Sequence, residues 1–513
     1  MRSYLIILWS LLALPSCLYA QDERDSIYQS EIIGKLIKDH FLQHHLSYPK
    51  NFGEVELNYQ GTSGDLRRAQ EAYSKRNINF YAIGSNELGK FQISGDFLFN
   101  KKLTDSLSFG QRNDMEPWNP YSYYASKAGN YQSQLYRSNF TLSYKLGRIF
   151  RPFIQINYQY KWTTGSVDPR FDNKVFGIQY RPGIQVNVKN SSVALAAIIG
   201  NGRESQAISY KNKNYSQSLQ YPDRIHYLSL GYGNSAIRDS LNNRKYTDLW
   251  GVEVSLHQPL SSNTSLDMLS SLKKNKQEFT TDQKSTNKVY HVRGIYHEDQ
   301  YFGSATLFKS KSTLNQYLNL KADYITGYDF LRDLSADLSK SNYSVDVLNT
   351  SLNYLAEQQS IKPVNFLYGL GLSYFHVHRQ DNAQSIDVSN ANLKIQGTFG
   401  ANLKTGNAEL LRFQINPFYR TSISDDLKYA ANSMNHYIQQ VVFWDYTYYK
   451  TNLLGANLGA EWQSKRLFKQ YIFAVKADYQ IEQGSIKPSE YIINHPIGNL
   501  KRQQFQIGVK LYL

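Results

Sequence analysis

Two groups of histidines have a spacing that could bind a metal ion. His376 and His378 lie two residues apart, so an extended strand would present both imidazoles on one face. They continue an alternating apolar series made of Phe366, Tyr368, Leu370, Leu372 and Tyr374. On such a strand the two rings fit a membrane interface as amphipathic side chains. We therefore predict no metal at this pair.

His40 and His44 form the second group, with His45 adjacent, at a spacing that places two imidazoles on one face of a helix. That face offers no clear third ligand, so we predict a polar helix surface there. No local signature of a lipase or a protease accompanies either group. The sequence therefore predicts that the protein is not an enzyme and has no catalytic, cofactor-binding or metal-binding residues.

The elements that would position any site are strands. From Gly53 onward apolar and polar residues alternate with period two, most clearly from Phe153 to Trp162. In that stretch the apolar face changes from aliphatic to aromatic along its length, while the opposite face carries Gln, Asn and Lys. The change is typical of a lipid-facing strand that ends in an aromatic girdle, and the 42 tyrosines of the chain suit such girdles. The same division into an apolar and a polar face recurs at 139–146, 176–188, 454–463 and 471–480.

Connections between these strands alternate in length. Short ones are expected at 146–151, 189–192, 261–264, 405–408 and 464–468, and we assign them to the periplasmic side. Long polar ones are expected outside the cell, at 103–130, 201–223, 235–247, 422–436 and 483–500.

Many strands with one solvated, polar face and one apolar face indicate a single sheet that closes into a barrel, because a closed barrel leaves no exposed strand edge. No apolar run long enough for a membrane helix follows the first residues of the chain. We therefore predict an all-β fold: a transmembrane, antiparallel, up-and-down β-barrel over residues 53–513. It should have roughly 18–20 strands, within a range of about 14–22.

The first 20 residues have the layout of a secretory signal peptide, with a charged start, a short apolar run and a small residue at Ala20. Cys17 leaves a second possibility open, because residues 14–17 loosely resemble a lipoprotein box in which this cysteine is acylated. It is the only cysteine of the chain, which excludes a disulfide framework and a cysteine-based metal site.

Residues 21–52 do not alternate. Ile33, Leu36, Ile37 and Phe41 lie at helical spacing and predict a short amphipathic helix that ends before Pro49. This N-terminal segment would plug the lumen, pack in the barrel mouth or form a periplasmic arm. The connection 103–130 is dense in proline and aromatic residues, which predicts an ordered loop. It could constrict the lumen, contact a partner or simply cap the mouth.

The last nine residues, Phe505 to Leu513, alternate up to the chain end. They resemble the C-terminal signal of bacterial outer-membrane β-barrels, with Gln506, Gly508, Leu511 and Leu513 in the matching places. The final Leu departs from the Phe or Trp usual in that signal. The resemblance implies recognition by the barrel-assembly machinery, and we expect this strand to pair with the strand near 53–60.

The chain from residue 21 to 513 resembles a family of uncharacterised outer-membrane barrels of the Bacteroidota type. Its members are often encoded near TonB-dependent receptors, which implies a possible receptor partner in uptake. A TonB-dependent receptor itself would have a large plug domain before the barrel, and only the segment 21–52 is expected to precede it here.

The net charge of +15 brings no nucleic-acid motif with it, so we predict no nucleic-acid partner. Contact with anionic lipopolysaccharide and lipid of the outer membrane, a lumen favouring anionic solutes, or loop charges that aid solubility would each explain it. The predicted function is passive or accessory transport in the outer membrane. The alternatives are a structural or adhesion scaffold that displays its loops and, third, an outer-membrane lipase or protease.

Overall fold

The computed structural model describes residues 51–110, 117–216, 220–237, 241–282, 290–311, 313–333, 338–358, 363–405, 409–430, 435–466, 471–487 and 495–513. The predicted signal peptide, Cys17, the helix expected within 21–52 and the histidines His40, His44 and His45 lie outside the described residues.

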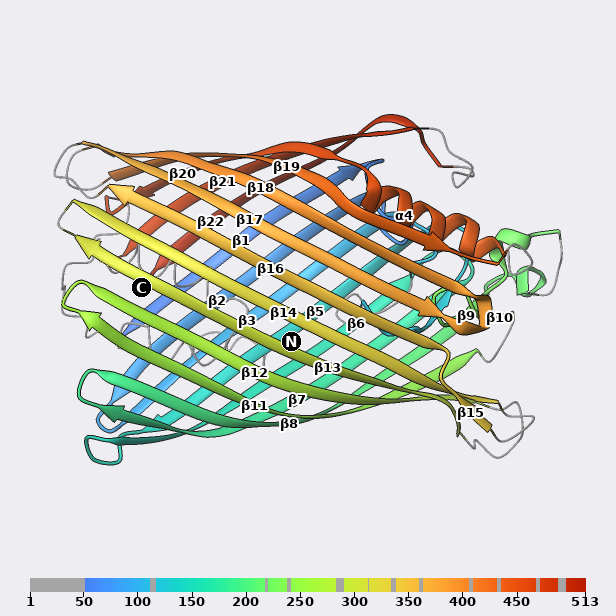
Figure 1. Ribbon diagram of the computed structural model, residues 1–513, viewed down its shortest axis with the longest axis horizontal. Helices are drawn as coiled ribbons and strands as arrows, with labels where there is room; N and C mark the ends of the chain where they lie inside the picture. The colour runs from blue at the N-terminus through green and yellow to red at the C-terminus, as the bar shows by residue number, and fades with distance from the viewer. Residues whose placement is uncertain are drawn as a thin grey trace, which may run out of the picture.

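Eighteen strands close into one antiparallel barrel (Figure 1), which confirms the predicted fold and falls within the predicted count. The strands are β1 (Phe52–Gly64), β2 (Ser74–Leu88), β3 (Phe91–Leu107), β5 (Gly129–Tyr144), β6 (Phe150–Gly165), β7 (Arg170–Val188), β8 (Ser191–Ser209), β11 (Asn242–Ser261), β12 (Thr264–Asp282), β13 (Tyr290–Lys311), β14 (Leu314–Asp333), β16 (Tyr343–Gln358), β17 (Val364–Asp381), β18 (Ile386–Thr405), β19 (Glu409–Lys428), β20 (Leu453–Ser464), β21 (Ile472–Ile486) and β22 (Gly498–Tyr512). The short strand β15 (Leu338–Lys340) only extends the pairing at the end of β14.

The terminal strand closes the barrel as predicted. β22 pairs antiparallel with β1, where Gln506 lies opposite Gln60, and with β21 on its other side. Beyond the last strand residue, the backbone N–H of Leu513 donates to the carbonyl of Gly53 at 2.8 Å. Both edges of the terminal strand are therefore paired.

Alternate residues of each strand point outward and form an apolar belt. Ile507 of β22 is 53% exposed, Leu195 of β8 is 52% exposed and Leu370 of β17 is 52% exposed, although these strands lie on different sides of the barrel. A continuous apolar surface of this extent is stable against lipid and not against water. The belt makes this a transmembrane β-barrel. Among the described residues, no helix is long and apolar enough to cross a membrane.

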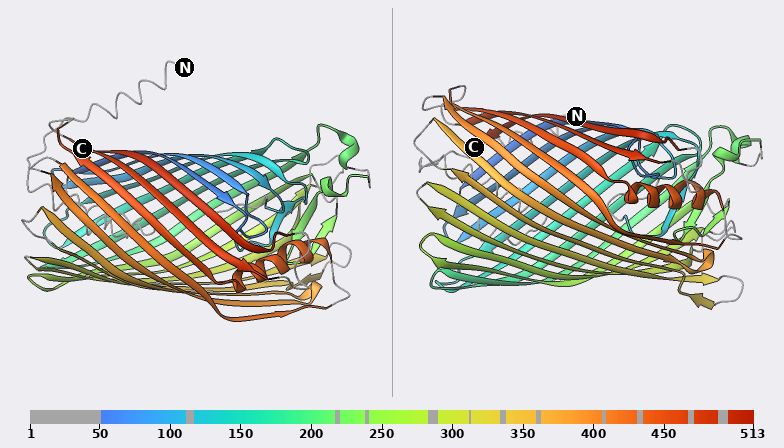
Figure 2. Two further views of the ribbon diagram at one scale, coloured as in Figure 1. Left: turned by 90° about the horizontal axis from the view of Figure 1, so that it is seen from above. Right: turned by 45° about the horizontal axis from the view of Figure 1, so that its top comes forward.

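The two ends of the barrel differ, as predicted. Short turns and the C-terminus lie at one end, and the longer connections lie at the other (Figures 1 and 2). The strands run further into the long connections than the sequence predicted, since β8 reaches Ser209, β19 reaches Lys428 and β21 reaches Ile486. Beyond the lipid the outward face becomes polar, so the alternation that marks a strand fades before the strand ends.

Candidate functional site

Three segments fold back from the long-connection end into the barrel (Figures 1 and 2). We call them together the mouth plug: residues 65–73 between β1 and β2; the small sheet of β4 (Tyr121–Tyr124), β9 (Tyr227–Leu230) and β10 (Ser235–Ile237); and the π-turn η5 (Ile438–Val442) with the helix α4 (Phe443–Lys450) that continues it.

The helical part of the plug begins at Asn435, whose Oδ1 accepts a hydrogen bond from the backbone N–H of Ile438 at 3.0 Å. Its buried side chains lie on all sides and include Val441, Trp444 and Tyr449. A helix whose apolar and aromatic side chains point to all sides is stable only where it is enclosed, and here the barrel encloses it. This helix was not predicted from the sequence, because a short apolar run without helical periodicity fits a buried strand equally well.

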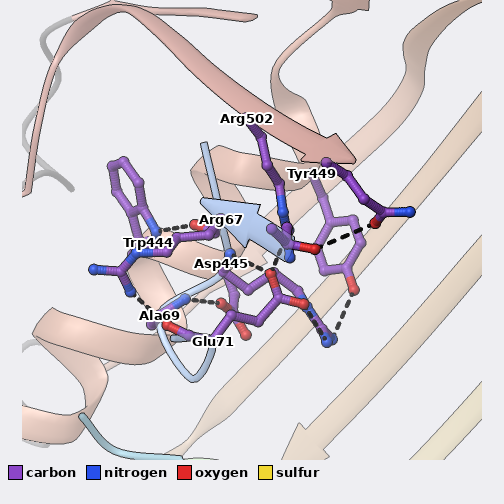
Figure 3. Close-up of polar contacts among 10 residues, drawn as sticks. Arg67, Ala69, Glu71, Trp444, Asp445, Tyr449 and Arg502 are labelled. Carbon is purple, nitrogen blue, oxygen red and sulfur yellow. Dashed lines mark hydrogen bonds and ion pairs between the residues drawn. The ribbon is translucent and has the colours of Figure 1, made fainter. Parts of the chain in front are cut away.

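The helix holds the segment 65–73 through two hydrogen bonds (Figure 3). The indole Nε1 of Trp444 donates to the carbonyl of Arg67 at 2.8 Å, and the backbone N–H of Ala69 donates to Oδ1 of Asp445 at 3.0 Å. Burial raises the pKa of the Asp445 carboxyl, and Arg68 acts against this shift. Asp445 therefore fixes the segment through a fully enclosed hydrogen bond, which is a costly bond to leave unmade.

The same segment is tied to the barrel wall by charge. Glu71 accepts from Arg68 at 3.2 Å and from Arg502 of β22 at 2.8 Å (Figure 3). Burial alone would raise the pKa of Glu71, but the two arginines and Lys75 outweigh it and lower the pKa to about 2. Glu71 is therefore ionised at neutral pH and links the plug to β22.

His495 supports the helix from the connection before β22. Its ring stacks on Trp444 with centroids 4.3 Å apart, and its Nε2 lies 2.9 Å from the carbonyl of Gln440. Burial lowers the pKa of His495 to about 4, and the charge of Arg67 acts in the same direction. The neutral ring donates Nε2–H to that carbonyl.

We expect acid to loosen this contact. The folded pKa lies below the usual value near 6.5, so the stabilisation is complete above about pH 6.5 and declines as the pH falls toward 4. Hydrogen exchange of the amides of η5 and α4, corrected for intrinsic rates, should show weaker protection at pH 5 than at pH 7. The control is His495→Gln, which keeps a neutral donor and should lose most of the difference. An equal loss of protection in both proteins would contradict the assignment.

The small sheet of the plug is anchored by Tyr121. Its hydroxyl donates to Oδ2 of Asp329 on β14 at 2.8 Å, and its ring stacks on Phe279 of β12 at 5.0 Å. The neighbouring Tyr124 stacks on Tyr227 at 5.1 Å, which joins β4 to β9. The described part of the connection 103–130 is thus ordered and turns into the lumen, which is one of the three outcomes that the sequence left open.

Gly294 of β13 makes room for Tyr121. A Cβ atom added at Gly294 would overlap the Tyr121 hydroxyl and ring, whereas a Cβ at Gly303 of the same strand would meet nothing within 4 Å. We expect Gly294→Leu to displace Tyr121 and to weaken the docking of the small sheet against the barrel wall by about 1–3 kcal/mol. Hydrogen exchange of β4 and β9 should rise in this variant and stay unchanged in Gly303→Leu. Unchanged exchange in both variants would show that Tyr121 does not anchor the sheet.

The plug and the wall share one hydrophobic core that spans the barrel. Its buried wall residues come from strands on every side, including Phe171 of β7, Phe279 of β12, Val347 of β16 and Leu500 of β22. Arg379 of β17 is held within this layer by cation–π contacts with the rings of Tyr232 and Trp118, 4.5 and 5.0 Å from their centroids. The core therefore forms a layer across the lumen near the long-connection end.

Between this layer and the short-turn end the barrel contains a cavity of about 630 Å³. Its wall comes from β14, β16 to β22, β1 and β2. The inward side chains there are mainly amides and charged groups. The arrangement is a polar chamber beneath an apolar, aromatic layer.

The structure places His376 and His378 on the outer face of β17, in register with the exposed Phe366 and Leu370, as the sequence predicted. His376 Nε2 lies 3.1 Å from the hydroxyl of Ser389, and His378 Nε2 lies 2.8 Å from a carboxylate oxygen of Asp387. Within the described ranges no group of three or more His, Cys, Asp or Glu side chains is placed to hold a metal ion. The expectation that the protein lacks catalytic and cofactor sites stays a prediction.

Fold, apolar belt and mouth plug together define a transmembrane β-barrel that carries its own internal plug. The chain belongs to the family of unknown function (DUF6850), whose sequence model matches residues 41–513. A search of curated protein sequences gave no significant match.

Several solved structures resemble the fold. The ferric yersiniabactin uptake receptor FyuA from Yersinia pestis has a TM-score of 0.43 and 9% identity, over 90% of this chain and 80% of the receptor. The ferric preacinetobactin receptor BauA from Acinetobacter baumannii has a TM-score of 0.38 and 9% identity, over 90% and 80%. OccAB3 from the same organism has a TM-score of 0.37 and 10% identity, over 90% of this chain and 99% of OccAB3.

Proposed function

We propose that the protein is an outer-membrane transport barrel whose passage is gated by the mouth plug. The short-turn end would face the periplasm and the long-connection end the outside, as is usual for outer-membrane barrels. In the structure described above the plug is docked, so this is the closed state of the barrel. The proposed role is permeation rather than catalysis.

The observation that carries the proposal is the pairing of a polar chamber with a plug that fills the lumen between this chamber and the long-connection end. A barrel that served only as a membrane anchor would not need a polar chamber between its plug and its short-turn end. If the lumen were filled permanently, we would expect the inward residues of the strands to be apolar along the whole barrel. Besides its part in the shared apolar core, the segment 65–73 is held by polar contacts with Asp445, Trp444 and Arg502, which a change in the mouth of the barrel could release.

The test is to compare the solute permeability of the intact barrel with that of a barrel lacking the plug helix, both reconstituted in liposomes. The intact protein should pass little sucrose and the helix-deficient protein should pass it readily. Two equally tight barrels would contradict a gated passage and would favour a scaffold that displays its loops.

A further inference from the structure

The polar chamber between the plug and the short-turn end is rich in amide side chains. Ten of its 29 lining residues are Asn or Gln, including Gln396, Gln414, Asn457 and Gln506. Strand alternation turns these amides inward, because their neighbours Ile395, Ile415, Leu458 and Ile507 are exposed on the outer face. The solute that contacts this wall therefore meets mainly neutral hydrogen-bonding groups.

The charged groups of the chamber are arranged as ion pairs. Lys510 lies 3.3 Å from Glu54 and 3.5 Å from Glu56, and Lys476 lies 2.9 Å from Asp478. Arg412 lies 3.9 Å from Glu461. The lining thus contains three cations and four carboxylates, and each of the cations faces a carboxylate. This balance gives no support to the expectation of a lumen that favours anions, which came from the net charge of the whole chain.

Some amides of the inner wall are held in place by each other. On the adjoining wall Asn79 donates to Asn58 at 2.7 Å and Asn100 donates to Asn79 at 2.5 Å, while in the chamber Gln414 donates to Asn416 at 2.8 Å. An amide has two N–H donors and an oxygen with two lone pairs, so one internal bond leaves donors and acceptors for a ligand. These groups are oriented before a ligand arrives, which reduces the entropy lost on binding.

We propose that the chamber binds neutral, polyhydroxylated solutes, namely oligosaccharides, during their passage through the barrel. Each sugar hydroxyl both donates and accepts, which matches fixed amides and carboxylates. Tyr81, which also lines the chamber, offers a ring surface to the C–H faces of sugars. An anion would need cations free of carboxylates, and a peptide would need apolar pockets for its side chains. The proposal names the substrate class of the transport function proposed above and rests on it.

Gln414 and Gln506 allow a sharp test, because they lie on one row of the wall. Cross-strand pairing runs from Gln414 to Gly459, then to Asp478 and to Gln506. The double variant Gln414→Leu/Gln506→Leu removes two amides from that row and keeps the side-chain size similar. The matched control is Gln316→Leu, since Gln316 does not line the chamber and lies in register with the exposed Leu318 and Leu320 on the outer face of β14.

The experiment is isothermal titration of the detergent-solubilised full-length protein with three probes: maltohexaose, tetra-alanine and tripolyphosphate. We expect maltohexaose to bind the wild type and Gln316→Leu, and to bind the double variant about tenfold or more weakly, as the loss of two neutral hydrogen bonds implies. Absence of maltohexaose binding to the wild type would overturn the proposal, as would tighter binding of either other probe. Equal binding to the double variant would overturn it too.

The titration measures binding and does not depend on transport. The proposed transport function and the proposed oligosaccharide binding can therefore be tested independently. Maltohexaose binding together with a helix-deficient barrel that stays sealed would overturn the transport function alone. A conducting helix-deficient barrel that does not bind maltohexaose would overturn the oligosaccharide assignment alone.

Discussion

Replacing residues 435–450 by a short Gly-Ser linker should convert the barrel from nearly sealed to permeable. The change removes η5 and α4, and with them the hydrogen bonds that Trp444 and Asp445 make to the segment 65–73. The barrel wall should remain closed, because β19 and β20 pair from Glu409–Ser464 to Arg420–Leu453 without help from the helix. An unplugged barrel of this size has an aqueous channel, so sucrose-driven swelling of liposomes should rise on the order of tenfold or more.

The matched control replaces residues 211–216 by the same linker. This part of another long connection contains the short 3-10 helix η1 (Lys213–Ser216), which has no buried residue. Its replacement should leave swelling at the wild-type level. Similar swelling in the two variants would mean that loop damage in general, and not loss of the plug helix, makes the barrel leak.

Deleting Leu511–Leu513 should abolish assembly of the barrel. The deletion unpairs the start of β1, where Val55 lies opposite Leu511, and the start of β21, where Phe473 lies opposite Leu511 on the other side. Within lipid each unpaired backbone group costs several kcal/mol, so a barrel with such a gap is not stable. The measurement is the heat-modifiable migration of the folded protein on unheated gels of the membrane fraction, which should disappear.

Leu513→Phe is the control for this deletion. It restores the aromatic end that outer-membrane barrels usually have and keeps every backbone pairing of β22, so folded protein should persist. Folded, membrane-inserted protein after the deletion would show that closure by β22 is dispensable and would contradict the assembly role of the terminal strand.

The barrel wall was predictable from the sequence because lipid imposes a simple rule on it. Each strand must show an apolar residue at every second position, and in β6 and β22 this rule holds almost from end to end. The same rule placed His376 and His378 on the outer face. The rule is harder to apply to β13 and β14, because these strands carry many polar residues and their alternation is difficult to follow.

The mouth plug was not predictable by the same reasoning. Its contacts join residues far apart in the chain, such as Ala69 with Asp445 and Glu71 with Arg502. No local spacing marks such pairs, and a barrel interior can be filled by any connection long enough to turn inward. Asn435 followed by an apolar, aromatic stretch was the one available signal, because that pattern fits a capped and fully enclosed helix.

The composition of the chamber also required the structure. The net charge of +15 suggested an affinity for anions, but that total covers the whole chain, including its connections. Only the register shows that Lys510 and Arg412 lie beside carboxylates of neighbouring strands on the inner wall. Net charge describes the long-range field of a protein and does not describe a cavity whose charges are paired.

Planar-bilayer recording of single inserted proteins can decide whether the mouth plug closes an otherwise open barrel. The wild type and the variant lacking residues 435–450 are measured under the same conditions. We expect the wild type to stay near the baseline and the variant to give stable conductance steps with weak ion selectivity. Steady steps of the same size in both proteins would show that the plug does not close the barrel.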